Sequence, residues 1–284
     1  MSIDQIEEIV RGAESLGFHS VWFMDHLAPP GLADADSLEG WTVAAALARR
    51  TERIRLGHLV LADPLRHPAV LAKMAATLDV ITEGRFDLGL GWGSSPDELR
   101  RYGITTGGAR ERALRMAETL EILNRMFTGQ PFSFRGRYHT LEDAIGRPTP
   151  TWGRIPIHIG GSGSKLTMPL VRRYADWWNC PSYATEDLIS LREQAGSARI
   201  SVQHPVGMAT NRRRVDEVAS EAHRRFGDWG GLICGTPQDV TERFVDEARL
   251  GAEMFIIQFS DFATPGTLRL FAREVMPAVR AAVR

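Results

Sequence analysis

Two short segments of the sequence have residue types suited to chemistry. The first is the glycine turn Gly160, Gly161, Ser162 and Gly163, which follows an apolar run and precedes a stretch that we expect to be helical as far as Tyr174. Glycines let backbone N–H groups converge on an anion, and the N-terminus of a helix adds partial positive charge. The turn matches neither a dinucleotide fingerprint nor a Walker A loop. Taken alone it is compatible with a phosphate cradle and with an ordinary strand-to-helix turn.

The second segment is the pair Asp25 and His26, which ends a short apolar run over residues 19–24. A histidine at the end of a strand can give or take a proton near neutral pH. Asp25 and His26 are therefore candidate catalytic residues. The alternative is structural, with His26 bonded to a loop carbonyl and Asp25 capping a turn.

The other strand ends disfavour several classes of enzyme. They carry no lysine for a Schiff-base aldolase, no carboxylate pair for glycoside hydrolysis and no metal-binding cluster of histidines and acids. A barrel isomerase or aldolase acting on a sugar phosphate would use the same glycine turn, but it would need a base at another strand end. Strand ends with few reactive side chains, together with a candidate phosphate cradle, indicate a bound organic cofactor.

Length and composition indicate one α/β domain over residues 1–284, with 43% hydrophobic and 24% charged residues. The net charge of −1 and the absence of a basic stripe disfavour a nucleic-acid partner. No apolar run is long enough for a membrane span, and the first residues do not read as a signal peptide. The two cysteines, Cys180 and Cys234, lie far apart, which favours a reducing cytoplasm.

Apolar runs alternate with amphipathic stretches along most of the chain. Seven runs read as strands, and they lie at about 19–24, 53–61, 84–91, 155–159, 176–179, 200–209 and 253–259. Near-continuous apolar strands between helices predict a parallel sheet. A TIM (β/α)8 barrel is the expected fold, with a doubly wound open sheet as the rival. A hairpin over Phe132–His139 interrupts the alternation and predicts an insertion near 130–150.

A complete barrel has eight strands, and this chain begins with a helix capped by Ser2. We therefore expect the first strand to be missing from this sequence, either because the native start lies upstream of Met1 or because the barrel is incomplete. A seven-stranded barrel exposes two strand edges, which dimerisation could cover. A homodimer is the expected oligomer, and a truncated, non-catalytic barrel subunit remains an alternative.

Several stretches taken together resemble the bacterial luciferase-like monooxygenase superfamily, and most of all its branch of coenzyme F420-dependent oxidoreductases. The matching stretches are residues 16–26, 53–57, 66–79, 84–93, 157–163, 174–179, 234–237 and 271–277. The ordered set covers nearly the whole chain. The resemblance implies a TIM barrel with an insertion near 130–150, and a flavin or deazaflavin lying across the carboxyl ends of the strands.

The resemblance also assigns roles to residues. It places the family's strand-two histidine, often assigned proton transfer, on His26 beside Asp25, and a non-prolyl cis peptide bond on Leu59-Val60. It places the phosphate loop on the glycine turn. The cofactor-binding residues that we expect are Leu59, Val60, Leu61, Gly91, Trp92, Gly93, Gly160, Gly161, Ser162, Gly163 and Asn179.

Within this superfamily the sequence favours F420 over FMN, because the segments 160–167 and 175–179 are closer to F420-type relatives. Only Lys73 and Lys165 among the 34 basic residues are lysine, which fits an actinobacterial setting where F420 is common. The expected function is hydride transfer between F420 and a small organic substrate. The alternative is an FMN-dependent monooxygenase supplied by a reductase partner. Ser94 stands where a sugar-phosphate dehydrogenase branch carries an acid, which disfavours that substrate.

Overall fold

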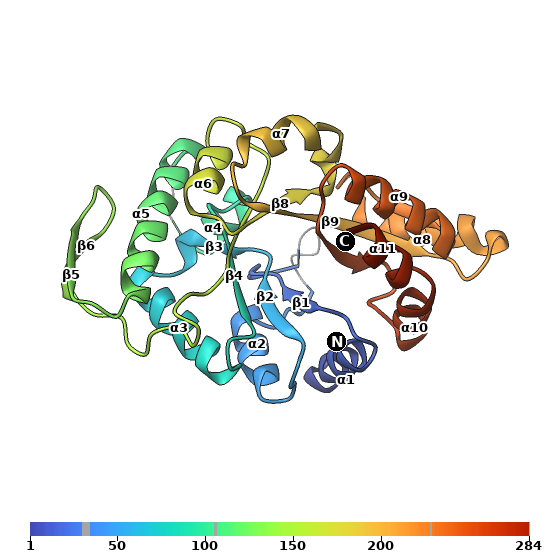
Figure 1. Cartoon of the computed structure of the whole chain (residues 1–284), viewed down its shortest axis with the longest axis horizontal. Coiled ribbons are helices and arrows are strands. Elements are labelled where there is room, and N and C mark those ends of the chain that lie inside the picture. The colour runs from blue at the N-terminus through green and yellow to red at the C-terminus, as the bar shows by residue number, and fades with distance from the viewer. Residues whose placement is uncertain (30–34, 105–106, 228, 284) are drawn as a thin grey trace.

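The computed structural model describes residues 1–29, 35–104, 107–227 and 229–283. Within them a parallel sheet forms the centre of the molecule (Figure 1). Its hydrogen-bonded path runs through β1 (Ser20–Phe23), β2 (Arg55–His58), β4 (Phe86–Gly91), β7 (Ile157–Gly160), β8 (Trp177–Pro181), β9 (Arg199–Met208) and then β11 (Met254–Phe259). Two short strands were not expected: β3 (Leu61–Ala62) pairs with β4, and β10 (Ile233–Gly235) pairs with β9.

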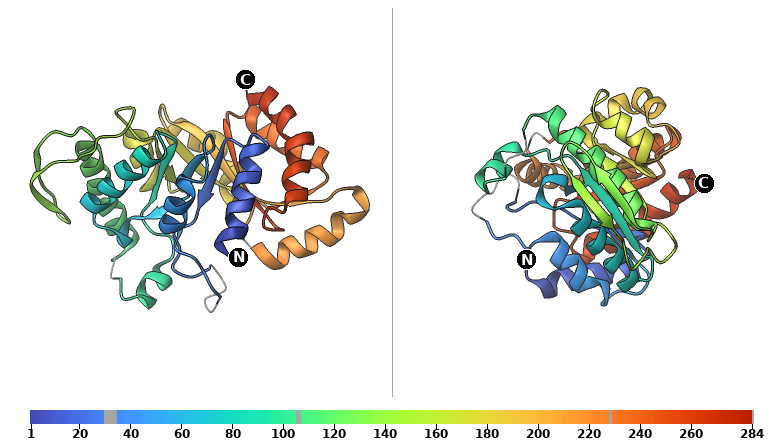
Figure 2. Two further views of the ribbon diagram at one scale, coloured as in Figure 1. Left: turned by 90° about the horizontal axis from the view of Figure 1, so that it is seen from below. Right: turned by 90° about the vertical axis from the view of Figure 1, so that its left-hand side faces the viewer.

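Helices lie around the outside of these strands (Figures 1 and 2). They are α1 (Ile3–Ser15), α2 (Gly40–Ala48), α3 (Pro68–Ile81), α4 (Pro96–Arg101), α5 (Ala109–Phe127), α6 (Thr167–Tyr174), α7 (Leu188–Gln194), α8 (Val215–Phe226), α9 (Pro237–Arg249), α10 (Pro265–Glu274) and α11 (Met276–Val283), with 3-10 turns at η1 (Asp63–Leu65), η2 (Ser182–Asp187) and η3 (Arg212–Arg214). The short helices α4 and α7 were not predicted, whereas the alternating parallel α/β architecture was predicted.

The strands are apolar because the helices bury them. Every residue of β4 is buried, and its Phe86, Leu88 and Leu90 are completely inaccessible to solvent. They share a core cluster with Trp178 of β8. A second cluster joins α1, β9, β11 and α10, and in it Phe18 stacks on Phe271 with ring centroids 5.9 Å apart. A strand covered on its outer face and packed inside the barrel has no side exposed to water, so its sequence reads as one apolar run.

The sheet stays open between its two end strands. Among the described residues, no backbone hydrogen bond joins β1 to β11. Val21 and Phe23 of β1, and Phe255 and Ile257 of β11, nevertheless pack against the same apolar cluster. The prediction of a parallel barrel-type sheet is thus confirmed, and among the described strands β1 and β11 are not paired with each other.

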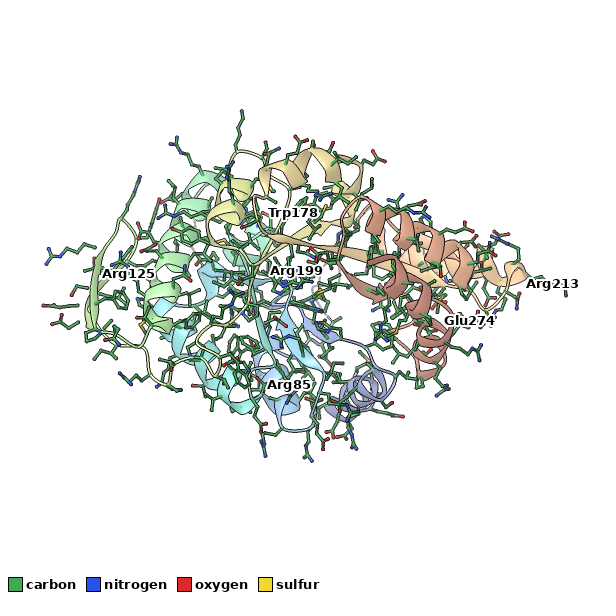
Figure 3. All side chains as sticks on the ribbon, in the orientation of Figure 1. Arg85, Arg125, Trp178, Arg199, Arg213 and Glu274 are labelled. Atoms are coloured by element: carbon green, nitrogen blue, oxygen red, sulfur yellow. The ribbon has the colours of Figure 1, made fainter. Side chains whose placement is uncertain are left out.

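The expected insertion is present as an antiparallel hairpin of β5 (Phe132–Arg135) and β6 (Thr140–Ala144), which pairs with no strand of the main sheet. It lies at the opposite end of the molecule from α8 (Figure 1). Arg125 of α5 lies over the rings of Phe132 and Phe134, each 5.8 Å from the guanidinium carbon, and so packs the hairpin on α5 (Figure 3).

None of the described helices combines the length and the apolar composition needed to cross a bilayer. The described residues also contain no group of three or more His, Cys, Asp or Glu side chains arranged to hold a metal ion.

His58, the last residue of β2, is completely buried and stacks on Trp41 with ring centroids 5.0 Å apart. Burial lowers the pKa of His58 to about 4, which outweighs the opposing effect of the Gly40 backbone. The folded protein therefore holds this imidazole neutral far below the pH at which the unfolded chain protonates it.

We predict that His58 makes the fold acid-sensitive. Its stabilising contribution is complete above its unfolded pKa of about 6.5 and is lost as the pH falls toward 4, by about 3 kcal/mol in total. Urea unfolding at neutral pH and at the acid end of this window measures the change. His58→Phe keeps an aromatic ring against Trp41 and is expected to flatten the dependence, whereas replacing the exposed His223 should not. An unchanged slope in His58→Phe contradicts the assignment.

Candidate active site

The carboxyl ends of the strands surround a cavity of about 550 Å³. The sequence placed thirteen residues in a catalytic or cofactor-binding role, and all thirteen line this cavity: Asp25, His26, Leu59, Val60, Leu61, Gly91, Trp92, Gly93, Gly160, Gly161, Ser162, Gly163 and Asn179. Met208 and residues 258–260, at the carboxyl ends of β9 and β11, do not line it. The hairpin β5–β6 contributes no lining residue either.

Sequence reasoning missed several lining residues because other elements bring them in. They are Glu98 of α4, Arg112 of α5, Thr167 of α6, Gln203 of β9, Tyr183 of η2 and Trp229 of the loop after α8. The Glu98 side chain is only 16% exposed, and it bonds to His26.

The peptide bond between Leu59 and Val60 is cis, as the resemblance implies. The neighbouring strands make room for this segment with glycines. A Cβ added to Gly91 would stand 2.6 Å from a methyl group of Val60, and one added to Gly89 would stand 1.8 Å from the backbone oxygen of His58. Real Cβ atoms do not come this close, so β4 needs glycine at both positions for residues 58–60 to lie against it as they do.

The glycine turn after β7 is fixed to the strand beside it. Trp178 Nε1 donates to the Gly161 carbonyl at 2.8 Å, and the Gly161 N–H donates to the Asn179 carbonyl at 3.2 Å. Gly161 has a φ of 121°, a conformation open to glycine and strained for other residues. Among the described residues no hydrogen bond occupies the N–H of Ser162 or Gly163. These two groups precede the N-terminus of α6, the arrangement that suits an anion.

Asp25 is the centre of a buried ion-pair cluster. Its Oδ2 accepts from the Ala62 N–H at 2.8 Å and from Arg66 Nη1 at 2.7 Å, and its Oδ1 accepts from Arg66 Nη2 at 2.8 Å. The same guanidinium donates to Glu39 at the start of α2. Burial opposes the charge of Arg66, but the hydrogen bonds and charges of Asp25 and Glu39 raise the pKa of Arg66. With both oxygens occupied, Asp25 positions the end of β1, and His26 is left as the group able to carry a proton.

His26 faces the cavity beside a carboxylate that the sequence did not indicate. Its Nδ1 lies 2.7 Å from Glu98 Oε2, and the other oxygen of Glu98 accepts from the Leu27 N–H at 2.6 Å and from the Ala28 N–H at 3.3 Å. Burial acts to raise the pKa of Glu98, but these hydrogen bonds outweigh it and the pKa is lowered. An ionised Glu98 accepts the Nδ1 proton, so Nε2 is the nitrogen left for exchange with a ligand.

Comparison with known proteins assigns the family. Residues 1–227 match the luciferase-like monooxygenase family. The chain belongs to that family. Its parallel α/β sheet is therefore that of a luciferase-like barrel.

This luciferase-like protein is similar to enzymes that use F420. It is 36% identical over 156 residues to an F420-dependent glucose-6-phosphate dehydrogenase of Microbacterium testaceum, covering 55% of this chain and 46% of that protein. A dehydrogenase of the same name from Beutenbergia cavernae is 33% identical over 235 residues, or 80% and 69% of the two chains. The chain spans about half the length of several such relatives.

A solved structure shows the same fold. The F420-dependent secondary alcohol dehydrogenase in complex with an F420-acetone adduct has a TM-score of 0.83 to this luciferase-like chain at 21% identity, covering 99% of this chain and 96% of that one.

We predict that Arg66 is needed chiefly because it compensates Asp25. Arg66→Met leaves a carboxylate that is 3% exposed without its partner, which is expected to cost about 3–5 kcal/mol of unfolding free energy. The double variant with Asp25→Asn should recover much of that loss. Chemical denaturation of the three variants measures it, and a double variant as unstable as Arg66→Met alone refutes the explanation.

A second prediction concerns the loop after β1. Because Glu98 accepts from two amides of that loop, Glu98→Ala should speed hydrogen exchange at Leu27 and Ala28, whereas Glu98→Gln keeps an acceptor oxygen and should change exchange less. Asp97→Ala, at the neighbouring exposed position, is the matched control. Mass spectrometry or NMR measures the hydrogen-exchange rates. Equal rates in wild type and Glu98→Ala would show that the carboxylate does not hold the loop.

Proposed function

We propose that this protein is an oxidoreductase that transfers a hydride between coenzyme F420 and a small organic substrate. The observation that carries the proposal is that His26, the Leu59-Val60 segment and the glycine turn all line the same cavity. F420-dependent dehydrogenases among the relatives support the choice of cofactor.

The cavity suits such a group. Its volume of about 550 Å³ lies within the range typical of ligand and cofactor pockets. It offers aliphatic side chains at Leu59, Val60 and Leu61 for a planar ring, and a glycine turn before a helix for a phosphate. When bound, a deazaflavin supplies the redox chemistry.

The chain's own residues then bind and orient the cofactor, and one of them moves a proton. The 59–61 segment supports the ring, and the glycine turn holds the phosphate. His26, fixed through Nδ1 by Glu98, exchanges the proton that accompanies hydride transfer at its Nε2. Asp25 and Arg66 keep the end of β1 in place, so that His26 does not move away from the cavity.

FMN is the second candidate, because the same cradle accepts the phosphate of FMN and the family is named for monooxygenases. In that case the enzyme would use reduced FMN and oxygen to oxygenate its substrate, and a separate reductase would supply the reduced FMN. The F420-dependent relatives favour the deazaflavin.

We further propose that the enzyme is a homodimer of the reducing cytoplasm. Two free cysteines, Cys180 and Cys234, support the compartment, and the unpaired edges of β1 and β11 support association.

Parallel titrations of the purified protein with oxidised F420 and with FMN, followed by fluorescence, test the cofactor. We expect saturable F420 binding in the micromolar range and much weaker FMN binding. Tighter FMN binding moves the assignment to a flavin monooxygenase, and binding of neither supports a non-catalytic barrel.

With a substrate in hand, His26→Ala is expected to lower kcat by about 10²-fold or more while F420 affinity changes little. Glu98→Gln should lower kcat by a smaller factor, because it loosens the imidazole without removing it. Substitution of the exposed His223 is the control. An unchanged kcat in His26→Ala contradicts the proton role.

A further inference from the structure

A buried histidine on β9 holds a loop of the cavity wall from behind. His204 is completely buried, and it does not line the cavity, whereas its neighbour Gln203 does. Successive side chains of a strand point to opposite faces, so His204 points away from the cavity. Its Nδ1 lies 2.9 Å from the Gly231 carbonyl oxygen, and its Nε2 lies 2.8 Å from Glu247 Oε2 of α9. A carbonyl oxygen only accepts, so Nδ1 carries a proton and donates it to Gly231.

The carboxylate of Glu247 connects His204 to a third segment. Arg243, also in α9, places its Nε 2.8 Å from Glu247 Oε1, so one oxygen of the buried carboxylate faces the histidine and the other faces the arginine. Arg243 Nη2 then donates to Thr185 Oγ1 at 3.2 Å, and Thr185 lies in η2. Through these side chains α9 joins β9 to the turn that follows β8.

The loop held by His204 packs directly on that turn. Ser182 Oγ donates to the Gly230 carbonyl at 2.8 Å. A Cβ added to Gly230 would stand 2.9 Å from the Cβ of Tyr183, and one added to Gly231 would stand 2.4 Å from the Ser182 carbonyl oxygen. Both glycines also have positive φ, 88° and 64°. The loop and η2 are therefore fixed to each other, and His204 ties the pair to β9.

Tyr183 of η2 and Trp229 of the loop both line the cavity. The proposed cofactor contacts come from β2, β4 and the turn after β7. The described lining residues from β8 onward are Pro181, Tyr183, Gln203 and Trp229, and none of them is charged. A substrate that reacts beside the ring has this part of the lining left to contact, and two aromatic rings there suit an apolar group.

We propose that His204 is a positioning residue, which by holding Gly231 fixes Tyr183 and Trp229 as a wall against which an uncharged, apolar part of the substrate packs. The inference rests on the proposed function and adds to it the kind of substrate group that the site selects. His204 contacts no ligand itself. It acts through the loop, and its bond to Glu247 keeps the imidazole in the orientation that this requires.

Two variants separate the two hydrogen bonds of His204. The amide nitrogen of asparagine is as many bonds from the backbone as Nδ1, so His204→Asn keeps a donor for Gly231. The amide nitrogen of glutamine corresponds to Nε2, so His204→Gln keeps a donor for Glu247 and loses the bond to the loop. Phe244→Leu is the matched control, because the Phe244 ring lies 5.8 Å from that of His204 and forms no hydrogen bond with it.

Chymotrypsin cleavage after Trp229 measures how firmly the loop is held, and cleavage after the completely buried Phe86 measures global unfolding. Relative to cleavage after Phe86, His204→Gln should be cleaved after Trp229 roughly 10-fold faster than wild type, as one lost hydrogen bond predicts. His204→Asn and Phe244→Leu should stay within about threefold of wild type. A cleavage ratio in His204→Gln equal to that in Phe244→Leu overturns the proposal.

Uncharged alcohols of increasing chain length, offered to F420 as hydride donors, test the consequence for the substrate. In wild type each added methylene group is expected to raise kcat/KM about three- to fourfold, because it packs on the wall. His204→Gln should lose this rise with unchanged F420 affinity, and His204→Asn should keep it. An equal rise in both variants contradicts the role of the wall. If wild type transfers no hydride from any alcohol, the proposed substrate fails, and the cleavage ratios still decide whether His204 holds the loop.

Discussion

The buried ion pair between Asp25 and Arg66 is the interaction on which the arrangement of the site depends. Asp25 lies just after β1, Arg66 follows η1, and the Arg66 guanidinium bonds to both Asp25 and Glu39 at the start of α2. Three segments distant in sequence are thereby held at one point beneath the cavity. Breaking such a pair leaves a charge with no water around it, so this point of the structure has little freedom to move. His26 follows Asp25 directly and takes its position from this anchor.

Around this ion pair, most of the lining residues shape the cavity, and few of them have reactive side chains. Glycines on β4 admit the Leu59-Val60 segment, and a glycine turn tied to β8 leaves backbone N–H groups facing the cavity. Reactive side chains are few: one histidine oriented by one carboxylate, and one arginine over one indole. A site of this kind suits a bound cofactor that supplies the chemistry, as we propose for this protein.

Much of this could be predicted from the sequence, because its local signals are strong. Apolar runs alternating with helices indicated the parallel sheet, and glycines at strand ends indicated the cradle. Glu98 and Arg112 could not be found in this way. Glu98 meets His26 across 72 positions of sequence, and a helix of six residues carries it there. Arg112 is one of many arginines, and only its burial over Trp92 distinguishes it. Both depend on tertiary packing that no local pattern encodes.

The most direct test of the account is a crystal structure of the protein with F420 bound. The account predicts the deazaflavin ring against the Leu59-Val60 segment, near His26, with its phosphate at the glycine turn. Density for F420 in any other place on the protein, or the same cavity empty at a saturating concentration, would contradict the claim that this cavity is the cofactor site.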